Sequence, residues 1–222
     1  MKRYLFPLII GLGGVAILVS LGVWQVQRLA WKEGVLADIS ARIAAQPVAL
    51  PAQPNPQQHA YLPVRAEGTV TDGLRVLASA KRRGAGYRMI SVFETDGRKV
   101  LLDRGFLSVD AQADAGAPQE ITVTGNLHWP DEVDGFTPEP DTEMNLWFAR
   151  DVPAMAAALG TEPVLIIARR IEPAGYAAEP MPVGATGIPN DHLEYAITWF
   201  SLAIVWAGMT AFLLWRIRQR TA

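Results

Sequence analysis

Two long apolar runs stand near the ends of the chain, and shorter apolar stretches alternate with polar residues between them. Residues 4–27 read YLFPLIIGLGGVAILVSLGVWQVQ and residues 196–215 read AITWFSLAIVWAGMTAFLLW, without any Lys, Arg, His, Asp or Glu. A helix of roughly 20 apolar residues crosses a bilayer core of about 30 Å. The pattern therefore predicts transmembrane helices over 4–27 and 196–215, with a separate domain over 28–195.

The helical pattern extends beyond the first apolar run. Apolar side chains recur near a period of 3.6 residues, so we expect the first helix to continue to Gln46 and Pro47. Four prolines within the next ten residues predict an extended linker over 47–58. The apolar positions that carry the helical pattern are Leu29, Val35, Leu36, Ile39 and Ile43.

Six apolar stretches of the middle domain have the length and spacing of β-strands. Short segments rich in Asp and Gly separate several of them, at 71–73, 84–86 and 95–97, and predict antiparallel hairpins. The predicted strands cover residues 63–70, 75–81, 87–94, 99–109, 121–128 and 163–170.

One short helix is expected within this domain. Residues 151–159 have Asp151 at the N-cap position and are followed by Gly160, a residue that commonly ends a helix. The expected fold is therefore an α+β membrane protein. Two transmembrane helices flank an exported, mostly antiparallel β domain, a sheet or open barrel with a few helices.

Charge is distributed unevenly along the chain. Residues 28–195 contain 15 Lys and Arg against 22 Asp and Glu, whereas the ends contain five basic residues and no acidic one. Because basic flanks stay on the cytoplasmic side, we expect both termini in the cytoplasm and the middle domain in the periplasm. The first run is too long for a signal-peptide core and lacks an A-x-A cleavage site, so we expect a retained anchor. These features indicate a multi-pass protein of a bacterial inner membrane.

The chain contains no cysteine. An exported domain without cysteine forms no disulfide and depends on its own hydrophobic core. Thiolate metal sites are excluded as well, including the paired thiolates that bind soft copper ions, and this argues against a copper chaperone.

No constellation of residues predicts an enzyme. His59, His128 and His192 are far apart in the sequence, and the chain has neither a G-x-S-x-G nucleophile turn nor a glycine-rich nucleotide loop.

The acidic segment 131–143 lacks the spacing of an EF-hand loop, so we interpret it as a solvated loop. The basic run 81–83 is either an anion site or the charged tip of a hairpin. An acidic domain outside the membrane argues against nucleic acid as a partner.

The aromatic residues divide into two sets. Tyr4 and Trp215 are expected at the cytoplasmic interface, and Trp24, Tyr195 and Trp199 at the outer one, as in an interfacial aromatic belt. Such a belt explains all five without a ligand.

His192 stands where the chain enters the second apolar run. It precedes Tyr195 by three residues and Trp199 by seven, so the three share one helical face. On this face, opposite Trp24, a neutral imidazole could bind a haem iron. Arg28 and Lys32, just outside the first span, would then pair with the haem propionates. The alternative is a polar capping cluster in which Asn190 or Asp191 caps the helix and His192 is only interfacial.

Five segments resemble one known family in their order and spacing. The chain is similar to the surfeit locus protein one family, whose members are assembly factors of haem-copper cytochrome c oxidase. This resemblance implies two spans around an exported domain and a role in delivering haem a to the largest oxidase subunit. It also implies contact with haem a synthase, and it places the family histidine at His192 and the family tryptophan at Trp24. The segments are LGVWQVQRLAWK (21–32), YLPVRAEGTV (61–70), GYRMISVFE (86–94), VLLDRGFLSVD (100–110) and PNDHLEYAITWF (189–200).

The chain departs from the family pattern beside the proposed ligand. Asp191 stands where the family usually has Asn, and Glu194 where it has Gln. A carboxylate there could orient the imidazole or disfavour anionic propionates. Two functions therefore stay open, neither of them enzymatic: a factor that binds haem a and assists its insertion, and an interaction protein that stabilises an oxidase intermediate without haem. Both would lie among membrane lipids.

Overall fold

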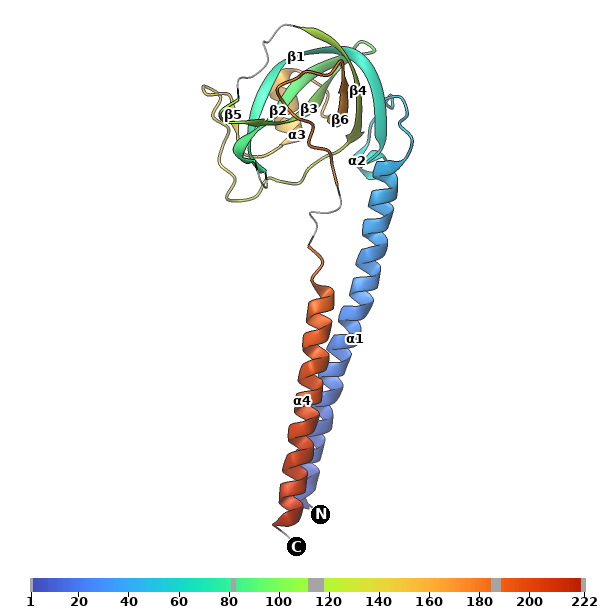
Figure 1. The fold of residues 1–222 in the computed structure, drawn as a ribbon, viewed down its shortest axis with the longest axis vertical. Coiled ribbons are helices and arrows are strands. Elements are labelled where there is room, and N and C mark those ends of the chain that lie inside the picture. The colour runs from blue at the N-terminus through green and yellow to red at the C-terminus, as the bar shows by residue number, and fades with distance from the viewer. Residues whose placement is uncertain (1, 81–82, 112–117, 185–188, 221–222) are drawn as a thin grey trace. The chain divides into compact units, whose positions relative to one another are not determined.

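The computed structural model describes residues 2–80, 83–111, 118–184 and 189–220, which belong to two compact units (Figure 1). Residues 1–38 and 185–222 make up a unit of two long helices, and residues 39–184 make up a β-barrel unit. The elements are α1 Lys2–Ala44, α2 Pro56–His59, β1 Pro63–Ala80, β2 Gly84–Thr95, β3 Arg98–Ser108, β4 Gln119–Leu127, β5 Leu146–Trp147, α3 Val152–Leu159, β6 Leu165–Glu172 and α4 His192–Gln219.

The strands form a closed barrel because β1 pairs at both of its edges. The order is β2-β3-β6-β4-β1, and β1 also pairs with β2, which completes the ring. Most pairs are antiparallel, as predicted, but β6 runs parallel to β3 and the short β5 runs parallel to β1. The predicted sheet or open barrel is therefore a closed barrel of five strands.

The predicted turn at 71–73 is wrong, and its place is taken by a β-bulge. β1 is one continuous strand of 18 residues whose register against β2 shifts between Thr71 and Gly73. A Cβ atom at Gly73 would lie 1.8 Å from the Ile90 carbonyl oxygen, so the strands approach closely there. A bulge bends a strand and increases its twist. The bend lets the first half of β1 pair with β4 and the second half with β2.

The remaining local predictions have mixed outcomes. The turn at 95–97 is confirmed, with positive φ at Asp96 (50°) and Gly97 (70°), as two-residue hairpin loops require. The segment 84–86 is instead the start of β2. The linker is extended where Val48 forms a bridge with Val64, but its end is helical, because Asn55 caps the short helix α2 with its side chain.

Two groups of buried side chains hold the barrel together. One group includes residues from all five barrel strands, and the other includes residues of β3 and of helix α3. Successive residues of β3 alternate between them: Val100 and Leu102 belong to the first, and Leu101 to the second. Helix α3 forms as predicted, with the Asp151 carboxylate accepting from the Ala154 N–H and Gly160 in the left-handed conformation.

The end of α1 is tied to the barrel through one carbonyl group. Helix α1 continues to Ala44, close to the predicted end at Gln46. The Ile43 carbonyl accepts hydrogen bonds from Asn126 Nδ2 at 3.3 Å and Arg169 Nη1 at 3.0 Å. The last carbonyls of a helix have no partner within it and carry partial negative charge. Asn126 and Arg169 therefore satisfy a group that the helix leaves open.

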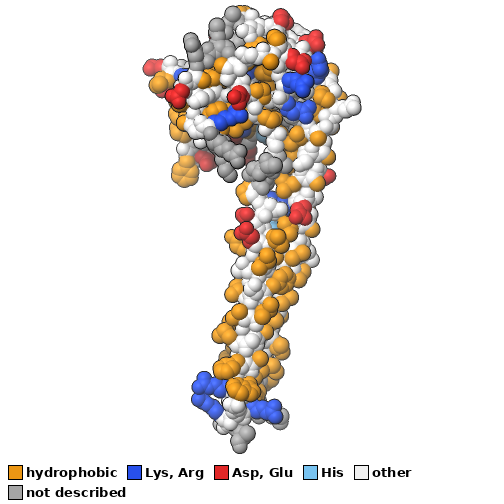
Figure 2. All heavy atoms as spheres, in the orientation of Figure 1, with side chains coloured by type: hydrophobic (Ala, Val, Ile, Leu, Met, Phe, Trp, Pro, Cys, Tyr) orange, Lys and Arg blue, Asp and Glu red, His pale blue; other side chains and the backbone are white. Residues whose placement is uncertain are grey.

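Helices α1 and α4 pack against each other in opposite directions. Three glycines of α1 lie so close to α4 that a Cβ atom would collide with it: Gly11 with Thr210, Gly14 with Trp206 and Gly22 with Phe200. Small residues allow this close approach in membrane helix pairs. Both helices are long and apolar enough to cross a membrane. Hydrophobic side chains are exposed along them (Figure 2).

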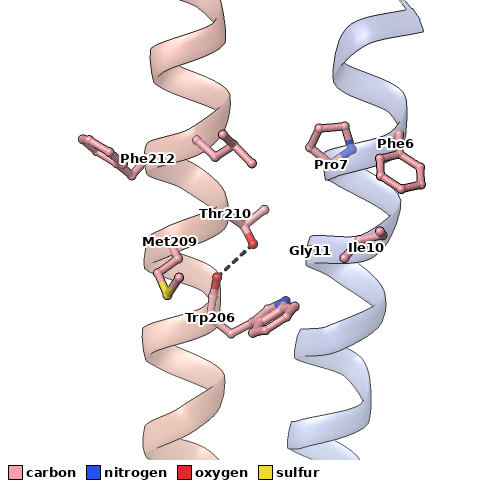
Figure 3. Close-up of a pocket in the computed structure, with 9 residues that line it drawn as sticks. Phe6, Pro7, Ile10, Gly11, Trp206, Met209, Thr210 and Phe212 are labelled. Carbon is pink, nitrogen blue, oxygen red and sulfur yellow. Dashed lines mark hydrogen bonds between the residues drawn. The ribbon is translucent and has the colours of Figure 1, made fainter.

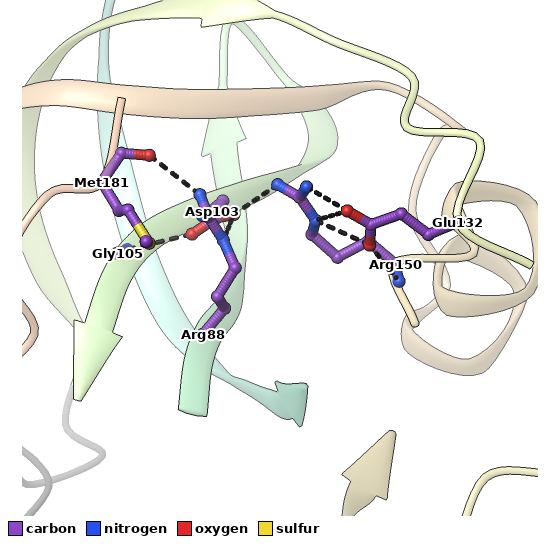
Figure 4. Close-up of polar contacts among 6 residues, drawn as sticks. All are labelled: Arg88, Asp103, Gly105, Glu132, Arg150 and Met181. Atoms are coloured by element: carbon purple, nitrogen blue, oxygen red, sulfur yellow. Dashed lines mark hydrogen bonds and ion pairs between the residues drawn. The ribbon is translucent and has the colours of Figure 1, made fainter. Parts of the chain in front are cut away.

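A buried ionic network lies at one place in the barrel (Figure 4). The Asp103 carboxylate is fully buried and accepts from Arg88 Nε at 2.6 Å, Arg150 Nη1 at 3.5 Å and the Gly105 N–H at 3.0 Å. Arg150 also forms an ion pair with Glu132. The hydrogen bonds from Arg150 lower the pKa of Glu132 despite its partial burial. Two strands and the segment before α3 thus share one buried charge.

The same network holds the segment that follows β6. Arg88 Nη2 donates to the Met181 carbonyl at 3.0 Å, and Phe106 exchanges backbone hydrogen bonds of 2.8 and 2.9 Å with Glu179. Gly105 has φ 117°, and a Cβ atom there would lie 1.9 Å from the Glu179 carbonyl oxygen. The sequence LDRGF of β3 therefore supplies both the buried carboxylate and the space for this segment.

We predict that Gly105→Ala will lower the free energy of unfolding of the barrel by at least about 3 kcal/mol, since it adds backbone strain and a collision. The control is Gly175→Ala, because Gly175 has a similar φ of 123° but open space around it. This variant should cost only about 1–2 kcal/mol of backbone strain. Hydrogen exchange of the β3 amides in the full-length protein would measure both, and equal effects would contradict the close contact with Glu179.

Candidate ligand site at the start of helix α4

The His192 side chain is bound to helix α1. Its Nδ1 atom lies 2.8 Å from the Oε1 atom of Gln25, and Gln25 is buried with 8% of its surface exposed. An amide oxygen accepts hydrogen bonds, so Nδ1 is the donor of this contact and Nε2 is the ring nitrogen left for a further partner. Metal-binding histidines commonly have one ring N–H held by an acceptor in this way. Within the described residues, no protein group is bonded to Nε2.

The segment before His192 is fixed to the same helix. Lys32 donates a hydrogen bond from Nζ to the Pro189 carbonyl. The Oδ1 atom of Asn190 is buried and has no hydrogen-bond partner among the described residues. Buried amide oxygens are normally bonded, and an unbonded one calls for an explanation such as a water or a ligand. The Asn190 oxygen therefore offers a polar group close in sequence to the His192 imidazole.

The other predicted site residues occupy different surroundings. Trp24 and Tyr195 are 54% and 56% exposed, whereas Trp199 is partly buried. The Arg28 guanidinium lies 3.9 Å from the centre of the Trp31 ring and so forms a cation–π contact. The structure thus joins His192 to Gln25 and Lys32 to Pro189. It leaves Trp24 and Tyr195 on exposed faces.

The structure supports only part of the interpretation that the polar residues before α4 cap this helix. Asp191 is the N-cap residue of α4, but its side chain forms no capping hydrogen bond. Glu194 lies in the first turn, where a carboxylate interacts favourably with the helix dipole. The Thr198 hydroxyl donates to the Glu194 carbonyl one turn further on. His192 therefore does more than occupy a cap, because its ring connects the two helices.

The other two histidines have different environments. His59 accepts a hydrogen bond at Nδ1 from the Asn55 N–H within the small turn around α2. His128 packs against Tyr61 in a tilted arrangement with ring centres 5.2 Å apart. Burial, together with the nearby charge of Arg150, lowers the pKa of His128 to about 4, so its ring is neutral at physiological pH.

The two charged clusters of the sequence are described to different extents. The acidic segment 131–143 is mostly exposed, and among the described residues no group of three His, Asp or Glu side chains could hold a metal ion. Lys81 and Arg82 lie outside the described residues. Arg83 forms an ion pair with Glu179 at 2.7 Å.

A separate apolar hollow lies at the opposite end of the helix pair (Figure 3). It is formed by the first turns of α1 and by residues 206–213 of α4. Residue 209 is about 25 Å along α4 from His192, given a rise of 1.5 Å per residue. The hollow is therefore distinct from the His192 site.

Gln25 was missed by the sequence reasoning, which treated residues 4–27 as one uninterrupted apolar run. A signal was available, because Gln25 and Gln27 are the first amide side chains in that run. A polar side chain inside an apolar span needs a partner, which here comes from the other helix. Identifying that partner requires the rotation of both helices, which spacing along one helix does not provide.

Comparisons with known proteins cover most of the chain. Surfeit locus protein 1 of Homo sapiens is 30% identical over 214 residues, which cover 83% of this chain and 69% of the relative. The SURF1-like protein of Drosophila melanogaster is 31% identical over 225 residues, covering 89% of this chain and 72% of the relative. Surfeit locus protein 1 of Rattus norvegicus is 29% identical over 212 residues, covering 82% and 67%.

The family model for the "SURF1 family" matches residues 12–204. This match runs from the first long helix through the whole barrel into the second long helix. It includes the five segments on which the resemblance was based, and the resemblance is confirmed. The chain belongs to the SURF1 family.

Proposed function

We propose that this protein is an assembly factor for haem-copper cytochrome c oxidase that holds haem a and assists its insertion into the largest oxidase subunit. The observation that carries the haem proposal is the His192–Gln25 hydrogen bond between two apolar helices. Membership of the SURF1 family supports the assembly role through the resemblance described above. Haem a is the cargo of this protein, and the chain performs no turnover on it.

The proposed location is the inner membrane of a bacterium. Helices α1 and α4 cross the membrane, both termini lie in the cytoplasm and the barrel lies in the periplasm. The length and composition of the two helices support this location. The orientation is supported by the five basic residues at the ends and the acidic excess of residues 28–195.

The chain's own residues each have a role in holding the cargo. Gln25 orients the His192 ring and keeps its proton on Nδ1, so that Nε2 can bind iron. The Asn190 oxygen is available to a polar group of the cargo. Arg28 lies at the same end of the helix pair, and its guanidinium, in cation–π contact with Trp31, would pair with a propionate. Exposed Trp24 and Tyr195 would cover a ring that lies outside the helix contact.

The orientation has a direct test in fusions to alkaline phosphatase, which folds only outside the cytoplasm because it needs disulfides. A fusion after Ala117 should be active, and a fusion after Ala222 should be inactive. The basic ends and acidic middle require this result. The reverse pattern would place the barrel in the cytoplasm and exclude the proposed periplasmic site.

The assembly role predicts where a defect arises. Deletion of the gene should lower cytochrome c oxidase activity while total haem a in the membranes is maintained, because insertion is impaired and synthesis is not. Oxidase assays and haem extraction from the same membranes measure both quantities. A loss of total haem a would indicate a biosynthetic enzyme instead.

Haem binding itself is tested at His192. His192→Ala should reduce haem bound to protein purified from cells that make haem a, or shift its Soret band, because the proposed iron ligand is absent. Gln25→Leu should keep the haem but shift the band, since the ring loses its hydrogen bond. Absorbance spectra and the haem-to-protein ratio are the measurements.

His59→Ala serves as the matched control, since it removes an imidazole whose hydrogen bond is local to the α2 turn. It should leave the spectrum unchanged, and so should His128→Ala. An unaltered spectrum in His192→Ala would assign the ligand elsewhere. If the unmodified protein carries no haem in such cells, the interaction-protein function replaces the haem-binding one.

A further inference from the structure

The apolar hollow at the terminal end of the helix pair has the size of a ligand site. Its volume is about 460 Å³, within the range of roughly 300–1,000 Å³ that is usual for small-molecule pockets. The residues that form it come from both helices (Figure 3). Those of α1 are Phe6, Pro7, Ile10 and Gly11, and those of α4 are Trp206, Met209, Thr210, Phe212 and Leu213.

The wall of this hollow is almost entirely apolar and favours a hydrocarbon group. Thr210 is the only residue in its wall with a hydroxyl, and that hydroxyl donates to the Trp206 carbonyl at 2.8 Å within α4. Met209 and Phe212 are 64% and 58% exposed, so the apolar wall faces the surroundings of the helices. Apart from the Trp206 indole N–H, which lies beside Gly14 of α1, the lining side chains therefore offer van der Waals contact.

The length of the hollow distinguishes an alkyl chain from a partner helix. On α4 the lining residues extend from Trp206 to Leu213, a distance of about 10 Å along the axis. A transmembrane helix is about 30 Å long and packs along much of that length. A short pocket of this kind accommodates part of an acyl chain better than a third helix.

Basic residues stand directly beyond the hollow. Arg216 follows Phe212 by four residues and Leu213 by three, so it lies on the same face of α4, one turn nearer the end. Residues 1–32 and 195–222 contain no Asp or Glu. The Arg216 guanidinium is exposed, and these segments supply no acidic side chain to neutralise it.

We propose that this hollow is a binding site for an anionic phospholipid, with one acyl chain among the apolar side chains and the phosphate at Arg216. Basic clusters beside membrane helices attract anionic headgroups in this manner. The proposal rests on the membrane placement of the helices proposed above, and it is independent of haem. A lipid held there would cover the contact between the first turns of α1 and the last turns of α4.

The test uses the full-length protein in detergent, mixed with phosphatidylglycerol or with phosphatidylcholine of identical acyl chains. Native mass spectrometry counts the lipids retained. We expect preferential retention of phosphatidylglycerol, and Arg216→Gln should lower it about fivefold through the loss of one cation near the headgroup. Met209→Trp fills the hollow and should lower the retention of both lipids.

Arg218→Gln is the matched control. It removes the same charge at nearly the same depth, but two residues along a helix correspond to about 200° of rotation, so it acts on the other face. Retention of phosphatidylglycerol should stay near that of the unmodified protein. Circular dichroism checks that each variant keeps its helices.

Several results would overturn the site. Equal retention of the two lipids excludes headgroup recognition, and equal effects of Arg216→Gln and Arg218→Gln reduce it to general surface attraction. Unchanged retention in Met209→Trp excludes the hollow as the place of the chain. Met209 can also be replaced by a photoreactive residue and crosslinked in membranes. If that residue labels another protein and no lipid, the hollow is occupied by a partner helix. By contrast, release of the protein from membranes by salt washing would show that the helices do not span the membrane. That result would contradict the proposed function as well.

Discussion

The buried carboxylate of Asp103 is the constraint on which the arrangement of the barrel unit depends. Its charge has no access to water, so it is tolerated only because Arg88, Arg150 and a backbone N–H surround it. Removing one partner of such a buried pair typically costs about 3–5 kcal/mol. The two arginines reach further, to Glu132 and to the Met181 carbonyl. One charge therefore fixes two strands, the segment before α3 and the segment after β6.

The unit of long helices is organised by shape and by one polar contact. Gly14 and Gly22 admit the side chains of Trp206 and Phe200, and this interdigitation fixes how deeply α1 and α4 approach each other. The His192–Gln25 hydrogen bond then fixes their rotation, because an amide and an imidazole in apolar surroundings must find partners. The two ends of this unit differ in chemistry. One presents polar groups, and the other presents hydrocarbon followed by positive charge.

This difference is consistent with a carrier of an amphipathic cargo in a SURF1-family protein. A haem needs a ligand for its iron and polar groups for its propionates, and His192, Asn190 and Arg28 belong to the same end of the helix pair. A phospholipid needs an apolar groove beside a cation, which the other end supplies. The fold of the barrel alone does not identify a function, since barrels of this kind serve many.

Local sequence patterns determined the elements whose causes are local. The long helices follow from the two apolar runs and the 3.6-residue pattern that continues the first of them, α3 from Asp151 and Gly160, and the hairpin turn from Asp96-Gly97. Even so, the bulge at 71–73 resembled a turn, because Thr-Asp-Gly suits both and only the pairing of β1 with two neighbours decides between them. The sequence also identified His192 as a candidate through its position at the start of a span. Its partner, Gln25, is 167 residues away. Periodicity assigns a residue to a face of its own helix, whereas contacts between helices depend on how both are rotated and packed, and this only the tertiary structure decided.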